Sequence, residues 1–217
     1  MKKTILLTIV MTAVLALVLS IGVFATEEPT APVQPDPMGQ PQIEQIDPAE
    51  QQPSLFSRIF NGGALAILGA ALAVGLAGIG SARGVGMVGE ATSGLLSENP
   101  NMFGKAFALM ALPMTQGIYG LVIAFLIVFK AGLFEAGGMD NLLALTVEEG
   151  AYYLMSALPI AVVGLISALK QARVSAAGIN LLAKRPDQVG KAITSAALVE
   201  TYAIFALLIS VLLVLVG

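Results

Sequence analysis

Long apolar blocks, separated by short polar stretches, dominate the pattern of this chain. Four of them cover residues 59–89, 104–130, 150–176 and 190–216. Each is long enough to cross a hydrocarbon layer of about 30 Å, which takes about 20 helical residues. The pattern predicts an all-α membrane protein with four transmembrane helices.

The first 58 residues follow a different pattern. Lys2 and Lys3 precede an apolar run over residues 5–24, which is typical of a secretory signal. Because this run is long for a signal, residues 1–25 are predicted to be either a signal peptide or an extra N-terminal transmembrane helix. Residues 26–58 are rich in proline, glutamine and acidic residues, which predicts a disordered linker on the outer face.

The composition narrows the chemistry that the chain can perform. Apolar residues make up 57% of the 217 and charged residues 12%, and there is neither cysteine nor histidine. A net charge of −3 argues against nucleic-acid binding. The chain has no Gly-x-x-x-x-Gly-Lys-Ser/Thr loop, so we expect no nucleotide and no organic cofactor. The remaining carboxylates, amides, hydroxyls and carbonyls suit protons and hard cations.

A gapless shift of 86 residues superposes the two halves of the chain. It places Ser81 on Ser167 and Pro100 on Pro186, and it aligns residues 104–106 with the identical residues 190–192. The chain is therefore predicted to be a duplicated helical hairpin. Residues 59–130 form the first hairpin, 131–149 an outer-face connection, and 150–217 the second hairpin.

Basic residues gather around the connections inside the two hairpins, whereas the connection between the hairpins is mainly acidic. The positive-inside rule then places both basic loops in the cytoplasm and both ends of the mature chain outside. The basic residues are Arg83, Lys105, Lys170, Arg173, Lys184, Arg185 and Lys191.

Small residues recur at spacings of four or eight in the first and third blocks, which lets membrane helices approach closely. Two interpretations remain open: a tight bundle within one chain, or an inner wall along which many copies pack into a ring. The residues are Ala66, Ala70, Gly78, Ala82, Gly86, Gly164, Ala168, Ala172 and Ala176.

Glu200 lies in the middle of the last apolar block, and no charged residue follows it. A charge at mid-membrane depth costs about 2.5–3.5 kcal/mol on insertion scales, so such residues are functional candidates. No lysine or arginine lies at its depth, and a desolvated, unpaired carboxylate holds a proton or binds a cation. The repeat places Met114 at the corresponding position, so one membrane carboxylate remains per chain.

Polar residues at a similar depth supply further oxygen atoms. Thr115, Gln116 and Tyr119 follow Pro113 in the second block, and Gln171 lies in the third. Interhelical hydrogen bonds of about 0.6–2 kcal/mol would explain any one of them. Together with the carboxylate, the amides and the hydroxyl form an oxygen set suited to a small hard cation.

Several motifs resemble one known family. They are residues 78–87, 112–120, 174–179, 183–186 and 199–204. With the doubled hairpin, they resemble the rotor-ring proteolipid (c or K subunit) of V/A-type ATPases, and especially its sodium-pumping members. The resemblance runs from about Asn61 to the C-terminus.

The resemblance implies a role for each site residue. Glu200 matches the ion-carrying carboxylate, and Tyr119 matches a hydroxyl that holds it. The implied sodium ligands are the side chains of Thr115, Gln116, Gln171 and Glu200 and the main-chain carbonyl of Leu112. Because Pro113 has no N–H, it leaves the carbonyl of Leu109 without its helical partner. The helix distortion has to extend by a further turn if the carbonyl of Leu112 is also to be free.

Two residues depart from the family pattern. Met114 stands where a sodium-pumping relative has glycine, and Lys170 stands where a small uncharged residue is usual. Lys170 either extends its amine to the cytoplasmic interface or lowers the affinity for a cation.

The resemblance implies a non-catalytic subunit that forms a homo-oligomeric ring in membrane lipid and carries one Na⁺ per copy. Implied partners are a stator a/I-type membrane subunit with an arginine and a central-stalk subunit. H⁺ as the coupling ion is an alternative, because Glu200 alone would serve for protons. An independent small channel or carrier and a purely structural membrane protein are two further alternatives.

Overall fold

The computed structural model describes residues 61–217, which lie within one compact unit, Gln52–Gly217. The predicted signal or extra helix (residues 1–25) and the predicted linker (residues 26–58) lie outside the described residues. Every regular element in the described part is helical. The elements are α3 (Gly62–Glu98), the 3₁₀ turn η2 (Pro100–Met102), α4 (Phe103–Ala111), the 3₁₀ turn η3 (Leu112–Met114), α5 (Thr115–Lys130), α6 (Met139–Ala144), α7 (Val147–Lys184), the 3₁₀ turn η4 (Pro186–Gln188) and α8 (Val189–Val216).

Side-chain caps fix the start of both long helices. Oδ1 of Asn61 accepts a 2.8 Å hydrogen bond from the Ala64 N–H at the start of α3. Thr146 and Glu149 form a reciprocal capping box at the start of α7, with bonds of 3.2 Å and 2.9 Å. Such caps satisfy N–H groups that the first helical turn leaves unpaired.

Four helical segments are long and apolar enough to cross a membrane: Gly62–Glu98, Pro100–Lys130, Val147–Lys184 and Pro186–Val216. A helix of 37 residues is about 55 Å long, whereas the hydrocarbon layer is about 30 Å thick. The longer helices therefore extend beyond the hydrocarbon layer. The prediction of an all-α fold with four transmembrane helices is confirmed.

The duplication is visible in the element bounds. α3 ends at Glu98 and α7 at Lys184, η2 and η4 begin at Pro100 and Pro186, and α5 and α8 end at Lys130 and Val216, each pair 86 residues apart. The residues before the two turns share one backbone conformation: Asn99 has φ −141° and ψ 83°, and Arg185 has φ −139° and ψ 81°. The two hairpins are copies of one unit that differ at η3, where the first hairpin is interrupted.

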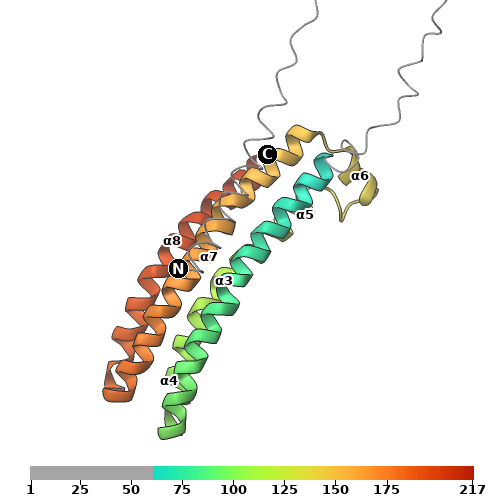
Figure 1. The fold of residues 1–217 in the computed structure, drawn as a ribbon. Helices are drawn as coiled ribbons and strands as arrows, with labels where there is room; N and C mark the ends of the chain where they lie inside the picture. Colours follow the sequence, from blue (N-terminus) through green and yellow to red (C-terminus); the bar gives the residue numbers. More distant parts are fainter. Residues whose placement is uncertain (1–60) are drawn as a thin grey trace, which may run out of the picture. The chain divides into compact units, whose positions relative to one another are not determined.

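The four spans run alongside one another (Figure 1), with α3 packed on α7, α5 packed on α3, and α8 packed on α7. Glycine allows the close contact between α3 and α7. A Cβ on Gly69 or Gly80 would come within 2.8 Å of the Cα of Leu154 or Leu165. α3 and α7 therefore form a tight pair, and α5 and α8 pack against this pair and against each other.

The small residues expected to line a ring divide into two groups. Ala66, Ala70, Gly164, Ala168 and Ala172 are buried inside the chain. In contrast, Ala82 and Gly86 are exposed and Gly78 and Ala176 are half-buried, and a Cβ on Gly78 or Gly86 would meet no atom within 4 Å. A spacing of four residues advances about 40° beyond a full turn, so such a series turns from one side of a helix to another.

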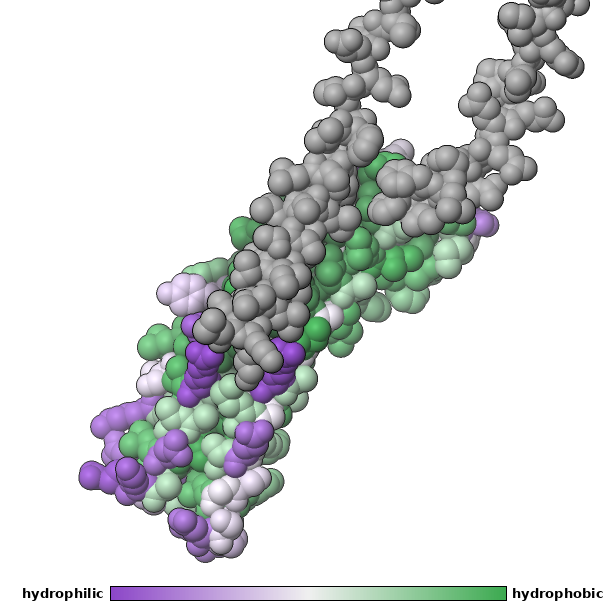
Figure 2. All heavy atoms as spheres, in the orientation of Figure 1, coloured by the Kyte–Doolittle hydropathy of each residue, from purple (hydrophilic) through white to green (hydrophobic). Residues whose placement is uncertain are grey.

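Polar residues gather at one end of the bundle. Figure 2 shows hydrophilic residues over the end where α4 and α8 begin, and mainly apolar residues over the rest of the visible face. At that end, Nζ of Lys105 donates a 2.9 Å hydrogen bond to the carbonyl of Pro186 and so links the two hairpins.

Candidate cation site at Glu200

Glu200 on α8 receives hydrogen bonds from both other helices that face it. The hydroxyl of Tyr119 on α5 donates to Oε1 at 2.7 Å, and Nε2 of Gln171 on α7 donates to Oε2 at 3.3 Å. The carboxylate is half-buried. Residues from three helices and both hairpins therefore meet at this group.

Two buried amides extend the site inwards. Gln116 and Gln171 are fully buried, and Nε2 of Gln116 donates a 2.6 Å hydrogen bond to Oε1 of Gln171. Nε2 of Gln171 also donates to the carbonyl of Ala196 at 3.2 Å. These bonds fix the Gln171 amide with its NH₂ group towards Glu200.

Oε1 of Gln116 is a buried acceptor without a hydrogen-bond partner in the part of the chain that the structure describes. Leaving such an atom unsatisfied costs about 1–3 kcal/mol. Within residues 61–217 the only ion pair joins Arg185 and Asp187 on the surface, so no basic side chain there neutralises Glu200. An unpaired oxygen and an unneutralised carboxylate in one site are the features that a small cation satisfies.

The interruption of the first hairpin lies beside these amides. α4 stops at Ala111, and η3 contains Pro113, which has no N–H to donate. The carbonyl of Leu112 accepts both the N–H of Thr115 and, at 3.0 Å, its hydroxyl. Leu112 and Thr115 thus contact each other next to Gln116, and the helix distortion includes Leu112, whose carbonyl already accepts two hydrogen bonds.

Ser81 is a site-supporting residue that the sequence analysis did not single out. Its hydroxyl accepts a 2.7 Å hydrogen bond from the N–H of Gly117 and lies 3.5 Å from the carbonyl of Met114. A Cβ on Gly117 would come within 3.1 Å of Ser81, so a side chain at this position would crowd the contact. The repeat partner of Ser81, Ser167, donates to the Val199 carbonyl at 3.1 Å. The identity of these serines under the 86-residue shift was the available signal.

The two residues that depart from the family pattern do not contribute a hydrogen bond from their side chains to this site. Met114 is 49% exposed, and Lys170 is exposed on α7 next to the buried Gln171.

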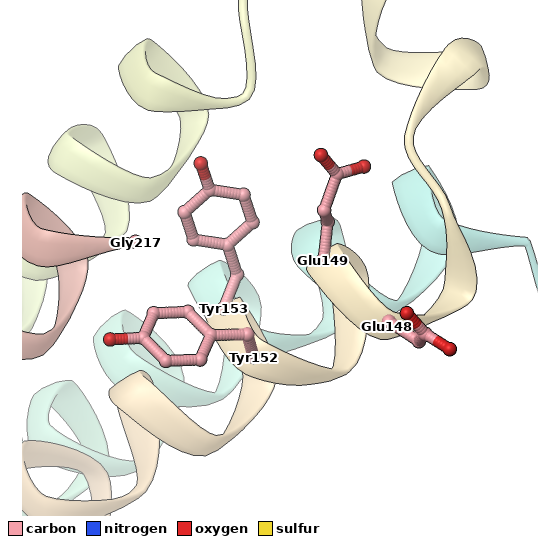
Figure 3. A pocket seen from close by; sticks show the side chains of 5 residues that line it. All are labelled: Glu148, Glu149, Tyr152, Tyr153 and Gly217. Carbon is pink, nitrogen blue, oxygen red and sulfur yellow. The ribbon is translucent and has the colours of Figure 1, made fainter.

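A shallow pocket lies elsewhere, where α7 begins and α8 ends. Figure 3 shows its lining: Glu148, Glu149, Tyr152 and Tyr153 from α7, and Gly217. The hydroxyl of Tyr152 donates to the carbonyl of Leu213 at 2.9 Å. This pocket shares no residue with the Glu200 site.

Comparison with known proteins links this geometry to a family. The family model for the ATP synthase C-subunit matches residues 68–127 and 154–213, one match in each hairpin. V-type sodium ATPase subunit K of Enterococcus hirae is 48% identical over 156 residues, which cover 71% of this chain and 94% of that protein. A-type ATP synthase subunit K of Methanocaldococcus jannaschii is 40% identical over 153 residues, covering 70% of this chain and 62% of that protein. The ATP synthase c-subunit of Syntrophomonas wolfei is 41% identical over 68 residues, which cover 30% of this chain and 94% of that protein.

Proposed function

Because the chain belongs to the ATP synthase C-subunit family, we propose that it is the ion-carrying rotor subunit of a V/A-type ATPase, with Na⁺ as its cargo. In this role it is a non-catalytic subunit, and ATP is hydrolysed or made by other subunits. Several copies form a ring in the membrane, and each copy carries one cation at Glu200.

The observation that carries the proposal is the unsatisfied Oε1 of Gln116 in a site with an unneutralised carboxylate. Na⁺ would bind Glu200 and Gln116, and Thr115, Gln171 and the Leu112 carbonyl would supply the remaining oxygens. The Leu112 carbonyl and Oε1 of Gln171 now accept hydrogen bonds, so each would exchange such a bond for the ion. The identity with a sodium ATPase subunit also supports Na⁺.

Charge neutralisation explains how one glutamate can move through lipid. An ionised carboxylate at mid-membrane depth is costly, and a bound cation removes its net charge. Tyr119 holds one oxygen of the carboxylate and Gln171 the other, so the group stays oriented while the ring turns. An arginine of a stator subunit would displace the ion where the ring meets an aqueous half-channel.

The proposed topology follows the charges. Lys105, Arg185 and Lys191 lie at the end where α4 and α8 begin, and this end would face the cytoplasm. The acidic connection between α5 and α7, with Glu135 and Asp140, would then lie on the outer face.

The test is carbodiimide labelling of Glu200 in the assembled protein, measured by mass spectrometry with and without Na⁺ at several pH values. The reagent attacks a protonated carboxyl group, so protection by Na⁺ near neutral pH reports a bound ion. We expect saturable protection by Na⁺ and none by an equal concentration of a large organic cation. Labelling that follows pH alone would indicate a proton-carrying rotor, and no labelling at all would overturn the rotor assignment.

A further inference from the structure

The contact surface between the two hairpins of one chain, here called the joint, predicts how two neighbouring chains contact each other. We propose that neighbouring copies dock through the same joint, with Tyr202 and Phe205 of one copy packed on Met114 of the next. This inference rests on the proposed ring. It assigns the contact surface to named residues and makes it the apolar counterpart of the Glu200 site.

The repeat carries the first step of the argument. Because the element bounds of the hairpins differ by 86 residues, the side of α7 that faces away from α3 is equivalent to the side of α3 that contacts α7. A Cβ placed on Gly164 would lie 3.1 Å from the Cβ of Ala77. A Cβ placed on Gly78, the repeat partner of Gly164, would meet no atom within 4 Å. A second copy in the same relation would fill that space with Val163, the repeat partner of Ala77.

The same shift replaces two hydrogen bonds of the cation site with pairs of side chains that contain neither a carboxylate nor an amide. The contact of Tyr119 with Glu200 becomes a contact of Phe205 with Met114 of the neighbouring copy. The contact between the amides of Gln116 and Gln171 becomes a contact of Tyr202 with Val85 of the neighbouring copy.

These residues are available in a single chain. Met114, Tyr202 and Phe205 are 49%, 66% and 61% exposed. The rings of Tyr202 and Phe205 already pack edge to face, with centroids 6.5 Å apart. A methionine sulfur packs favourably against aromatic rings. Exposure to lipid is ordinary for apolar side chains, so exposure alone does not indicate a partner. The register of the repeat is what indicates that a second copy of the chain covers this surface.

A polar contact at the other end of the joint follows the same rule. Within the chain, Lys105 donates to the Pro186 carbonyl. Shifted by 86 residues, this becomes a hydrogen bond from Lys191 to the Pro100 carbonyl of the neighbouring copy. Both residues are exposed in the single chain.

The arrangement accounts for one ion per chain. Joints would alternate around the ring, an oxygen-lined joint within each chain and a methionine–aromatic joint between chains. Met114 replaces the carboxylate of Glu200 and Tyr202 the amide of Gln116, so the joint between chains would have no anionic ligand for a cation.

Thiol cross-linking tests the contact directly, since the chain has no cysteine. The variant with Met114→Cys and Phe205→Cys, assembled in membranes, is treated with a short bismaleimide and run on a denaturing gel. Within a chain Tyr119 and Glu200 face each other, and each new cysteine is five residues, or about 140° around its helix, from one of them. The two thiols of one chain therefore point away from each other, and cross-links form between copies.

We expect a ladder of cross-linked multimers from this variant. The matched control combines Met114→Cys with Leu215→Cys, which is also exposed on α8 but about 15 Å further along the helix, and it should give no ladder. If the first variant fails to assemble, Pro100→Cys with Lys191→Cys decides by the same criterion.

The cross-linking result can be distinguished from the result of the sodium-protection test of the proposed function. Sodium protection of Glu200 in an assembled ring, with no ladder from either cysteine pair, would overturn this contact and leave the sodium rotor intact. A ladder together with labelling that ignores Na⁺ would support the contact and overturn the sodium assignment.

Discussion

The hydroxyl of Tyr119 donates a 2.7 Å hydrogen bond to Oε1 of Glu200, so the first hairpin holds the carboxylate that the second hairpin supplies. Neither hairpin has this pair by itself, because the repeat replaces Tyr119 with Phe205 and Glu200 with Met114. The site therefore exists where the two halves of one chain meet, and it depends on how they pack.

Tyr119→Phe should raise the Na⁺ concentration that half-protects Glu200 from carbodiimide by about tenfold. A hydrogen bond to a charged group contributes about 1.5 kcal/mol or more, and about 1.4 kcal/mol corresponds to a factor of ten. Tyr153→Phe is the matched control, because Tyr153 lies near the start of α7, 18 residues before Gln171, in the pocket of Figure 3 and away from the Glu200 site. Equal sodium requirements for the two variants would show that the Tyr119 hydroxyl does not hold the carboxylate.

Gln116→Leu should abolish protection by Na⁺ while labelling of Glu200 without Na⁺ keeps its pH dependence. The change removes the unpaired Oε1 and the donor to Gln171, but it leaves the bond between Tyr119 and Glu200 in place. Labelling titrated with Na⁺ at two pH values measures both effects. Gln188→Leu makes the same chemical change in η4 and should behave as the unmodified protein. Undiminished protection in Gln116→Leu would remove this amide from the cation site.

Much of this architecture can be predicted from the sequence because its signals are long and repeated. The four apolar blocks give the four spans, and the 86-residue shift gives the duplicated hairpin, since both depend on many residues at once. That Glu200 and the residues after Pro113 share a depth also follows from their positions along the helices.

Side-chain pairing could not be predicted in the same way, because it depends on how far each helix is rotated and how closely it packs. The sequence offers the Gln171 amide as an oxygen ligand, whereas in the structure its oxygen accepts from Gln116 and its nitrogen donates to Glu200. The small-residue series divides between the inside and the outside of the chain for a similar reason. Its spacing of four does not match the helical turn of 3.6 residues.

Ser81→Ala should destabilise the first hairpin and weaken sodium binding together. It removes the acceptor for the half-buried N–H of Gly117, next to Gln116, at a cost of about 1 kcal/mol. Ser93→Ala is the control on the same helix, because the hydroxyl of Ser93 bonds only to the Gly89 carbonyl one turn away. Thermal unfolding in detergent and sodium protection are measured on both variants. If Ser81→Ala unfolds at a lower temperature but binds Na⁺ normally, the serine stabilises the helix pair without positioning the site.

Lowering the pH should raise the Na⁺ concentration needed for half-protection of Glu200, by at most about tenfold per pH unit, since a proton and a metal cation compete for one ligand group. The competition arises because both would occupy the carboxylate that Tyr119 and Gln171 hold. Sodium titrations of carbodiimide labelling at successive pH values measure it. A maximal extent of protection that falls as the pH is lowered, at an unchanged half-protecting concentration, would mean that Na⁺ binds apart from the carboxylate. Competition would instead raise the half-protecting Na⁺ concentration as the pH is lowered, and full protection would return at a sufficiently high Na⁺ concentration.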